Sequence, residues 1–149
     1  MERSRGAHLA TLLLTGFEAM VADVVADLAA RGHPGVTATH EFALRAIGEG
    51  AQSASELGRR LGVTKQAAAK TISSLEELGY VERRTDPGDA RRKPLTVTDR
   101  GREMVTVGAR AFDRLRDALE AEVGADRLAV TESVLERLAA SRESLRVER

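Results

Sequence analysis

Apolar positions recur at helical spacing along the first part of the chain. They fall every three or four residues, and the stripe stops at Arg31 and Gly32, with Pro34 just beyond. Glycine favours a helix end and proline cannot continue a helix, so this pattern predicts one long N-terminal helix. The stripe consists of Leu13, Phe17, Met20, Val21, Val24 and Leu28.

Two shorter helices are predicted next, each with its own start and stop signals. The first begins near Thr39 as N-cap and ends in the glycine-containing turn 48–50. Ser53 and Glu56 then form a capping-box pattern, in which each side chain accepts a hydrogen bond from a backbone N–H at the helix start. Gly62 stands where a helix end needs a left-handed residue, so the second helix is expected to stop there.

A fourth helix follows after only a tight turn. Thr64 is a favourable N-cap residue, and the helix is expected to run as far as Gly79. Two short helices joined by a three- or four-residue turn that contains glycine form a helix-turn-helix. Two β-prone stretches, 80–84 and 95–98, flank the turn-rich charged loop 86–89, so a β-hairpin wing is predicted behind it.

Helical spacing returns after Thr98 and continues to the C-terminus. One long helix is expected to end at Gly124, and a final helix to begin with Asp126 as its N-cap. The chain is therefore predicted to be mainly α-helical with a small β-hairpin wing. The apolar stripe of the long helix consists of Val105, Ala109, Phe112, Leu119 and Val123.

The composition excludes several kinds of site. The 149 residues contain no cysteine, which rules out thiol catalysis, iron–sulfur clusters and cysteine-based zinc sites. The histidines His8, His33 and His40 lack the spacing of a metal-binding motif, so no metal site is expected. No nucleophile–base pair, phosphate-binding glycine loop or carboxylate pair occurs at useful spacing, so neither an enzyme nor a cofactor is expected.

The apolar run near the N-terminus is interrupted by polar and small residues at Thr11, Thr15, Gly16 and Glu18. This interruption indicates an amphipathic helix rather than a signal peptide or a membrane span. A cytoplasmic protein without membrane contact, associated with the nucleoid, is expected.

The net charge of zero conceals an uneven distribution. Residues 53–93 contain nine basic and six acidic side chains, whereas the segments before and after this range are net negative. Five of the basic residues fall within 83–93. A local basic footprint of this kind is typical of nucleic-acid-binding domains.

The fourth helix is predicted to have one apolar face and one small, polar and basic face. The inward positions are Ala68, Thr71, Ile72, Leu75 and Leu78, and the outward ones are Gln66, Ala69, Lys70 and Ser73. Such an outer face suits a major groove. Gln66 can pair with adenine, and Lys65 and Lys70 can contact guanine or phosphate. Ala67 or Ala69 can lie against a thymine methyl. An ordinary amphipathic surface helix is the alternative.

The hairpin tip concentrates cations where no core can use them. Arg91, Arg92 and Lys93 follow Asp89 closely. An arginine at such a tip gains from the negative potential of a narrow minor groove, and Asp89 is expected to hold a guanidinium extended through a bidentate pair. A solvated charged turn is the alternative, but the preceding helix-turn-helix favours DNA contact.

The chain resembles the MarR (multiple antibiotic resistance regulator) family of winged-helix transcription factors over essentially its whole length. The resemblance is carried by residues 55–64, 75–83, 86–93 and 97–101. In that family the arginine that matches Arg91 enters the minor groove, and the aspartate that matches Asp89 steadies it. Pro94 departs from the pattern, because it removes a hydrogen-bond donor from the second wing strand.

The resemblance implies one MarR-type domain over residues 1–149. Residues 1–36 and 100–149 are expected to form intertwined dimerisation helices, and residues 37–99 the winged helix-turn-helix lobe. The long helices also carry more apolar surface than a small lobe can cover, which independently favours a homodimer. Expected partners are double-stranded DNA with a pseudo-palindromic operator, a second copy of the chain, and a small phenolic or lipophilic effector that releases a repressor.

The residues expected to contact DNA are Ser53, Ser55, Thr64, Lys65, Gln66, Ala67, Ala69, Lys70, Ser73, Arg84, Asp89, Arg91, Arg92 and Lys93. The residues expected near an effector, in a crevice between the dimer region and the lobe, are Phe17, Met20, His40, Phe42 and Phe112. These five are also good candidates for an ordinary core. A winged helix that docks a protein is the alternative function, but it calls for an apolar or acidic recognition face.

Overall fold

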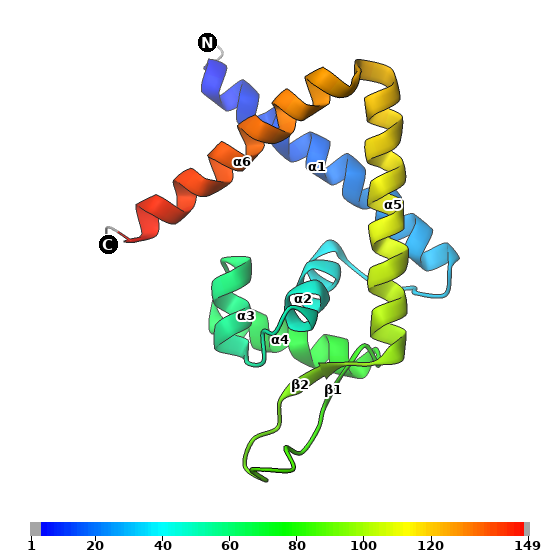
Figure 1. Ribbon diagram of the computed structural model, residues 1–149, viewed down its shortest axis with the longest axis vertical. Helices are drawn as coiled ribbons and strands as arrows, with labels where there is room; N and C mark the ends of the chain where they lie inside the picture. The colour runs from blue at the N-terminus through cyan, green and yellow to red at the C-terminus, as the bar shows by residue number, and fades with distance from the viewer. Residues whose placement is uncertain (1–3, 148–149) are drawn as a thin grey trace. The chain divides into compact units, whose positions relative to one another are not determined.

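The computed structural model describes residues 4–147, and side chains for residues 4–141. The helices are α1 (Arg5–Ala30), α2 (Ala38–Gly48), α3 (Ala54–Leu61), α4 (Lys65–Glu77), α5 (Asp99–Val123) and α6 (Ala125–Val147), and the strands are β1 (Val81–Arg83) and β2 (Leu95–Val97) (Figure 1). The mainly helical fold with one hairpin is as predicted. The chain forms two compact units, residues 1–111 and 112–149, so the boundary lies inside α5.

The start of α2 corrects one prediction, because Thr37 and not Thr39 is its N-cap. Thr37 Oγ1 accepts a hydrogen bond from the backbone N–H of His40 at 3.3 Å, and His40 Nδ1 accepts one from the backbone N–H of Thr37 at 3.1 Å. A histidine therefore occupies the position that Glu or Gln usually has in a capping box. The helix starts two residues earlier than the sequence pattern indicated.

Two other helix starts differ from the prediction in detail. Ser53 caps α3 as expected, since its Oγ accepts the Glu56 N–H at 3.2 Å, but the Glu56 carboxylate accepts the N–H of Gln52 instead of that of Ser53. The last helix, α6, begins at Ala125, so Asp126 lies in its first turn and is not the N-cap. Its negative charge is still favourable there, because a helix N-terminus carries partial positive charge.

Three helices end in the same way, with a left-handed glycine followed by a buried residue. Gly32, Gly50 and Gly79 have positive φ, and the next residues, His33, Ala51 and Tyr80, are buried. The N–H groups of these three residues donate to the carbonyls of Leu28, Ala46 and Leu75. These are Schellman ends, which satisfy terminal carbonyls and turn the next side chain into the core.

The core of the first unit lies between the end of α1, the helices α2 to α4, the hairpin and the first part of α5. Its largest fully buried side chains are Tyr80, Leu28, Leu44, Leu57, Ile72, Leu75, Met104, His33 and Glu41. The two strands are antiparallel, with Val81 opposite Val97 and Arg83 opposite Leu95. The hairpin projects away from the group formed by α2, α3 and α4 (Figure 1).

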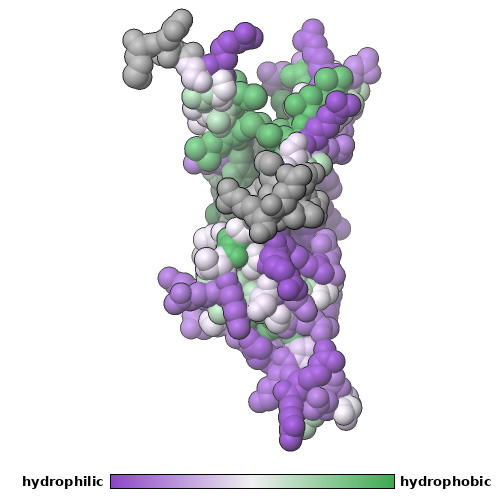
Figure 2. All heavy atoms as spheres, turned by 90° about the vertical axis from the view of Figure 1, so that its left-hand side faces the viewer, coloured by the Kyte–Doolittle hydropathy of each residue, from purple (hydrophilic) through white to green (hydrophobic). Residues whose placement is uncertain are grey.

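Helix α1 leaves most of its apolar side chains exposed, as the hydrophobic surface next to the N-terminus shows (Figure 2). Its exposed large apolar residues are Leu9, Leu12, Leu14, Phe17 and Met20. Among residues 4–147, α1 is the one helix that is long and apolar enough to cross a membrane, and 6% of that stretch is buried. Signal sequences and core helices of soluble proteins share this length and composition.

In the second unit, an arginine of α5 pairs with carboxylates on both α5 and α6. Arg116 on α5 pairs with Glu132 on α6 and with Glu120 on its own helix, both at 2.8 Å. The hydrogen bond from Arg116 lowers the pKa of Glu132. Leu128 of α6 is buried. This unit contains most of the segment 100–149 that was predicted to dimerise, and that prediction is not tested by a single chain.

The first turn of α5 lies directly against the residue that precedes β1. Thr98 Oγ1 accepts the Gly101 N–H at 3.1 Å and donates to the Gly79 carbonyl at 2.7 Å, while the Thr98 N–H donates to the Tyr80 carbonyl at 3.0 Å. A Cβ on Gly101 would overlap the Tyr80 carbonyl oxygen and lie 2.7 Å from Val97 Cγ1. Only glycine permits this approach.

We expect Gly101→Ala to destabilise the protein by about 1–3 kcal/mol, because the added methyl group forces backbone to move. This cost exceeds the gain of about 1 kcal/mol that alanine has over glycine inside a helix. The free energy of unfolding in urea measures the effect. Gly48→Ala is the matched control, since its Cβ would be 3.9 Å from Val97 Cγ2, an ordinary contact. Equal stability of both variants would contradict the argument.

Candidate nucleic-acid interface

Helix α4 separates a buried face from an exposed polar face, as the sequence predicted. Ala68, Ile72 and Leu75 are buried in the first unit. The exposed positions are Lys65, Gln66, Ala67, Ala69, Lys70 and Ser73. This outer face is narrow, carries two cations and offers an amide near the helix N-terminus, which are the properties that a major-groove helix needs.

The turn between α3 and α4 is tight, as predicted. Gly62 is left-handed, with φ of 70°, and Thr64 Oγ1 caps α4 by accepting the Ala67 N–H at 3.1 Å. Gly58 was not singled out from the sequence, yet a Cβ there would lie 3.0 Å from the Val63 carbonyl oxygen. The Val63 N–H donates to the Gly58 carbonyl at 3.0 Å. The two helices are therefore fixed at close range.

The wing continues beyond the two short strands through loop hydrogen bonds. The Arg84 N–H donates to the Pro94 carbonyl at 3.3 Å, and the Asp86 N–H donates to the Arg92 carbonyl at 3.1 Å. Pro94 therefore takes part as an acceptor just before β2, and its missing N–H does not interrupt the strand pairing from 95 to 97. Asp86 closes the tip by accepting the Gly88 N–H at 2.8 Å.

Asp89 has a different role at the tip from the one expected. Its carboxylate accepts the backbone N–H of Arg91 at 3.0 Å instead of pairing with that residue's guanidinium. This local Asp-to-backbone bond is a common turn arrangement and needs no long side chain to be ordered. Asp89 thus fixes the backbone that carries Arg91.

The three cations at the wing tip are exposed and free to meet an anion. In the part of the chain that the structure describes, no carboxylate lies within 4.0 Å of Arg91, Arg92 or Lys93. Hydrophilic side chains cover this end of the protein (Figure 2). By contrast Arg84 pairs with Glu82 at 2.6 Å. The tip therefore offers more unpaired positive charge than the base of the wing.

An ion pair links the wing to the C-terminal part of α4. Arg83 of β1 donates to Glu76 of α4 at 3.1 Å, and both side chains are about half exposed. The pair adds a polar contact between two elements that already follow each other in the chain. The remaining predicted DNA contacts, Ser53, Ser55 and Thr64, are exposed at the starts of α3 and α4.

Of the five residues predicted near an effector, the structure brings two together. The rings of Phe17 in α1 and Phe42 in α2 are stacked, with centroids 6.1 Å apart. Met20 is exposed on α1, and His40 already has hydrogen-bond partners for both ring nitrogens, Thr37 and Ser74. Phe112 belongs to the second unit. The crevice proposed from these five residues stays a prediction.

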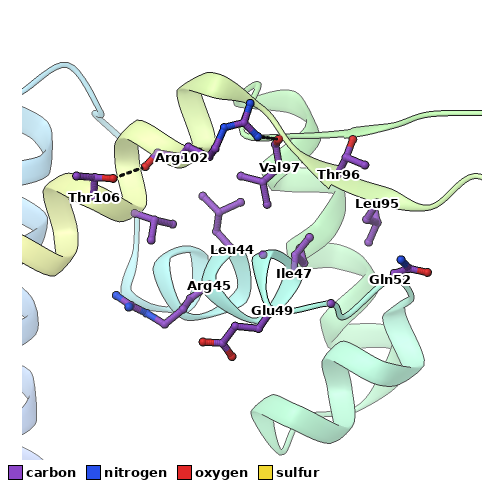
Figure 3. Close-up of a pocket in the computed structure, with 13 residues that line it drawn as sticks. Leu44, Arg45, Ile47, Glu49, Gln52, Leu95, Thr96, Val97, Arg102 and Thr106 are labelled. Carbon is purple, nitrogen blue, oxygen red and sulfur yellow. Dashed lines mark hydrogen bonds between the residues drawn. The ribbon is translucent and has the colours of Figure 1, made fainter.

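A pocket of about 750 Å³ lies elsewhere in the first unit, between α2, β2 and α5 (Figure 3). Leu44 and Ile47 of α2 point toward Leu95 and Val97 of β2, so its floor is apolar. Arg45, Glu49, Gln52, Thr96, Arg102 and Thr106 add polar groups. None of the five predicted effector residues lines it, and no periodicity in the sequence indicates a pocket of this kind.

Two buried polar groups also escaped the sequence analysis. Glu41 on α2 is 2% exposed and is paired with Arg45 one turn later. His33 is 1% exposed, and its Nδ1 lies 3.1 Å from the Tyr80 hydroxyl. Burial and the nearby Arg100 guanidinium both lower the pKa of His33. The Glu41–Arg45 pair has the i to i+4 spacing of an ion pair on a helix, which the sequence shows. No local pattern predicts the contact between His33 and Tyr80.

A family model described as the MarR family matches residues 35–92, which cover α2, α3, α4, β1 and most of the wing loop. The crystal structure of MarR superposes with a TM-score of 0.78 at 27% identity and covers 100% of both chains. Residues 35–92 of this chain are thus similar to the MarR family, and the whole chain has the fold of MarR. The MarR family consists of transcription regulators and not of enzymes, which confirms the expectation that this chain is not an enzyme.

Two curated proteins match shorter stretches. The LexA repressor of Deinococcus radiodurans is 32% identical over 91 residues, which are 59% of this chain and 41% of the relative. The HTH-type transcriptional regulator BilQ of Clostridioides difficile is 38% identical over 53 residues, which are 36% of each protein. The chain therefore matches less than half of the length of these two relatives.

Two further MarR-like structures were solved with bound molecules. FabT of Streptococcus pneumoniae, in complex with DNA, has a TM-score of 0.77 at 20% identity and covers 93% of this chain and 98% of that one; the likeness is one of fold. The Mycobacterium tuberculosis MarR family protein Rv2887, in complex with p-aminosalicylic acid, has a TM-score of 0.65 at 26% identity and covers 88% and 98%.

Proposed function

We propose that this chain is a sequence-specific, double-stranded-DNA-binding repressor that acts as a homodimer on a pseudo-palindromic operator. The observation that carries the proposal is the pairing of an exposed polar α4 face with an unpaired cationic wing tip in one compact unit. Phosphate contacts supply most of the affinity of such proteins, and base edges supply specificity. Action on DNA places the protein at the nucleoid in the cytoplasm.

The proposed contacts divide between the two grooves. Gln66 and the lysines at 65 and 70 face the major groove from α4, and Arg91 enters the minor groove from the wing. FabT, which shares the fold, was solved in complex with DNA, and this supports DNA as the ligand of the fold. Two lobes related by a two-fold axis would read half-sites about one helical turn, or about 34–36 Å, apart.

A protein-docking winged helix is the second candidate. Such a module needs an apolar or acidic outer face on α4, and the exposed residues of this helix are polar, basic or alanine. The residues at the wing tip are likewise cations. The charge of both elements therefore favours DNA over a protein partner.

We expect Arg91→Ala to weaken binding to a selected operator by about 5- to 100-fold, because each good groove contact contributes about 1–3 kcal/mol. Gln66→Ala should mainly relax the preference at one base pair. Fluorescence anisotropy at several salt concentrations measures both effects, and removal of a phosphate contact lowers the salt slope by about 1.

Arg110→Ala is the matched control for this experiment. Arg110 is an exposed arginine on α5, outside the proposed interface, so its loss removes the same charge without a groove contact. Equal effects of the two substitutions, or DNA binding that does not weaken as salt rises, would contradict the proposed function.

The homodimer is proposed because the exposed apolar surface of α1 is larger than scattered surface residues explain. The exposed apolar residues recur along this one helix and are 37–56% exposed. Helices α1, α5 and α6 are the proposed dimerisation helices. In a symmetric dimer, the same helix of a second copy would cover this surface.

We expect the protein without detergent to sediment as a dimer, and Leu12→Glu to shift it toward the monomer, since a buried charge at an interface costs several kcal/mol. Val63→Glu is the control: Val63 is also an exposed apolar residue but lies in the turn before α4. Analytical ultracentrifugation measures the mass. A monomer at all concentrations, or a protein that needs detergent, would overturn the dimer assignment.

We further propose a small aromatic acid as effector, with the pocket between α2, β2 and α5 as its site. Its volume falls within the range of small-molecule sites, about 300–1,000 Å³. The apolar floor suits a ring, and Arg102 at the pocket edge, whose partner Asp99 is fully exposed, suits a carboxylate. The complex of Rv2887 with p-aminosalicylic acid supports this ligand class. A ligand there would press on β2 and so on the wing.

We expect salicylate to raise the melting temperature and to lower the affinity for operator DNA. Thr106→Trp should abolish both effects, because an indole at this lining position fills the pocket. Thr131→Trp on α6 is the control, since Thr131, like Thr106, is exposed and donates to the carbonyl four residues earlier at 2.9 Å. If the Thr106→Trp variant still binds salicylate, the effector site is not this pocket.

A further inference from the structure

His40 joins the start of α2 to α4 through its side chain. Its Nδ1 accepts the backbone N–H of Thr37 at 3.1 Å, and its Nε2 lies 2.9 Å from the Oγ of Ser74 on α4. The two residues joined by the second bond are 34 positions apart in the sequence. This hydrogen bond links α2 to α4, the helix proposed to contact DNA bases.

The partner on one side of the ring fixes its protonation state. A backbone N–H can only donate, so His40 Nδ1 must carry a lone pair, and a neutral ring then has its proton on Nε2. That N–H points at Ser74 Oγ and donates to it. Burial lowers the pKa of His40, which favours the same neutral form. Both nitrogens thus have defined and different roles.

Ser74 stands at the edge between the two faces of α4. Its neighbour Ser73 is exposed and its neighbour Leu75 is buried, while Ser74 itself is half-buried. Other buried side chains of the two helices are apolar, among them Ala43 and Leu44 on α2 and Ile72 on α4, while the buried Glu41 of α2 is paired with Arg45 of the same helix. Apolar contacts have no preferred direction, so they allow one helix to rotate slightly against the other. A hydrogen bond requires a narrow range of length and angle, so it restricts this rotation.

A small rotation of α4 would matter at the groove. The side chains of a helix extend about 5–6 Å from its axis, so a turn of about 10° moves their outer atoms by about 1 Å. Base contacts tolerate only a few tenths of an ångström before a hydrogen bond is lost. Whatever fixes the rotation of α4 therefore also fixes where Gln66 and Lys70 point.

We propose that His40 is a positioning residue for DNA recognition: its Nε2–H, held toward Ser74 by the Thr37 backbone, sets the rotation of α4 against α2. The inference rests on the proposed DNA-binding function and extends it to a residue that does not touch DNA. Phe42, two positions further along α2, stacks on Phe17, so the same helix that orients α4 also contacts α1.

A double-mutant cycle on operator binding tests the proposal. Ser74→Ala and His40→Ala are each expected to weaken the affinity about tenfold, which corresponds to about 1.4 kcal/mol. The double variant should bind no more weakly than the weaker single variant, because both remove the same bond. His40→Gln, which offers an acceptor and a donor on one side chain, should recover part of the affinity.

Thr37→Ala is the matched control within the same capping box. It removes the hydroxyl that accepts the His40 N–H but keeps the backbone N–H that holds the ring. It should therefore lower the stability of the protein and leave operator affinity unchanged. Nitrogen-15 NMR of the ring gives a readout independent of DNA: Nδ1 unprotonated, Nε2 protonated, and an Nε2–H signal that shifts in Ser74→Ala.

The outcomes separate this inference from the proposed function. If the unsubstituted protein does not bind DNA, both fall. If it binds, and Arg91→Ala weakens binding while Ser74→Ala binds normally, the function stands and the positioning role is overturned. Additive losses in the double variant, or a ring protonated on Nδ1, overturn it as well. Loss of affinity in Thr37→Ala equal to that in His40→Ala would assign the effect to helix stability.

Discussion

The buried contact between His33 and Tyr80 joins the ends of two helices that are far apart in the sequence. Each residue follows the left-handed glycine of a Schellman end, His33 after α1 and Tyr80 after α4, and the two side chains meet at 3.1 Å. Arg100, at the start of α5, lies over the Tyr80 ring at 5.1 Å and donates to the Gly32 carbonyl at 3.1 Å. Both side chains are almost fully buried, so loss of the Tyr80 hydroxyl leaves His33 Nδ1 without its partner in the core, a costly state.

The elements proposed to contact DNA are positioned from this point. β1 starts at Val81, the residue after Tyr80. The Tyr80 carbonyl accepts the N–H of Thr98, the residue between β2 and α5. Helix α4 ends here, and both strands of the wing are attached here. The glycine at 101 is required because the first turn of α5 must pass close to that same carbonyl. A change in the orientation of α1 therefore has a direct mechanical path to α4 and to the wing.

Local signals in the sequence were sufficient for most element boundaries. Ser53, Thr64, Gly62 and Gly79 act as predicted because capping depends on residues within one turn. Thr37 is the exception: histidine is an unusual third residue of a capping box, so the local sequence does not identify this cap. The exposed face of α4 and the charged tip followed from periodicity and charge, which are properties of a single element.

Contacts between distant residues could not be predicted in this way. The partners of His33 and His40 lie 47 and 34 positions away, and no spacing rule connects them. The space around Gly101 depends on the hairpin folding back onto α5. The pairing of Asp89 was expected at the guanidinium, but a short side chain reaches a backbone N–H two residues on with less loss of conformational freedom. Tertiary packing and entropy decide these points, and neither is visible in a pattern of residue types.

A chain with zero net charge can still present a positive surface if its cations are unevenly paired. Arg31, Arg83 and Arg116 each have a carboxylate partner at the surface, where ion pairs add little stability, and Arg45 is paired with the buried Glu41. Their main effect is to cancel charge where they lie. Among the described residues, the cations at 65, 70 and 91–93 have no carboxylate within 4.0 Å. The potential outside α4 and the wing tip is therefore positive although the sum over the chain is zero. A polyanion is attracted to surfaces of this kind.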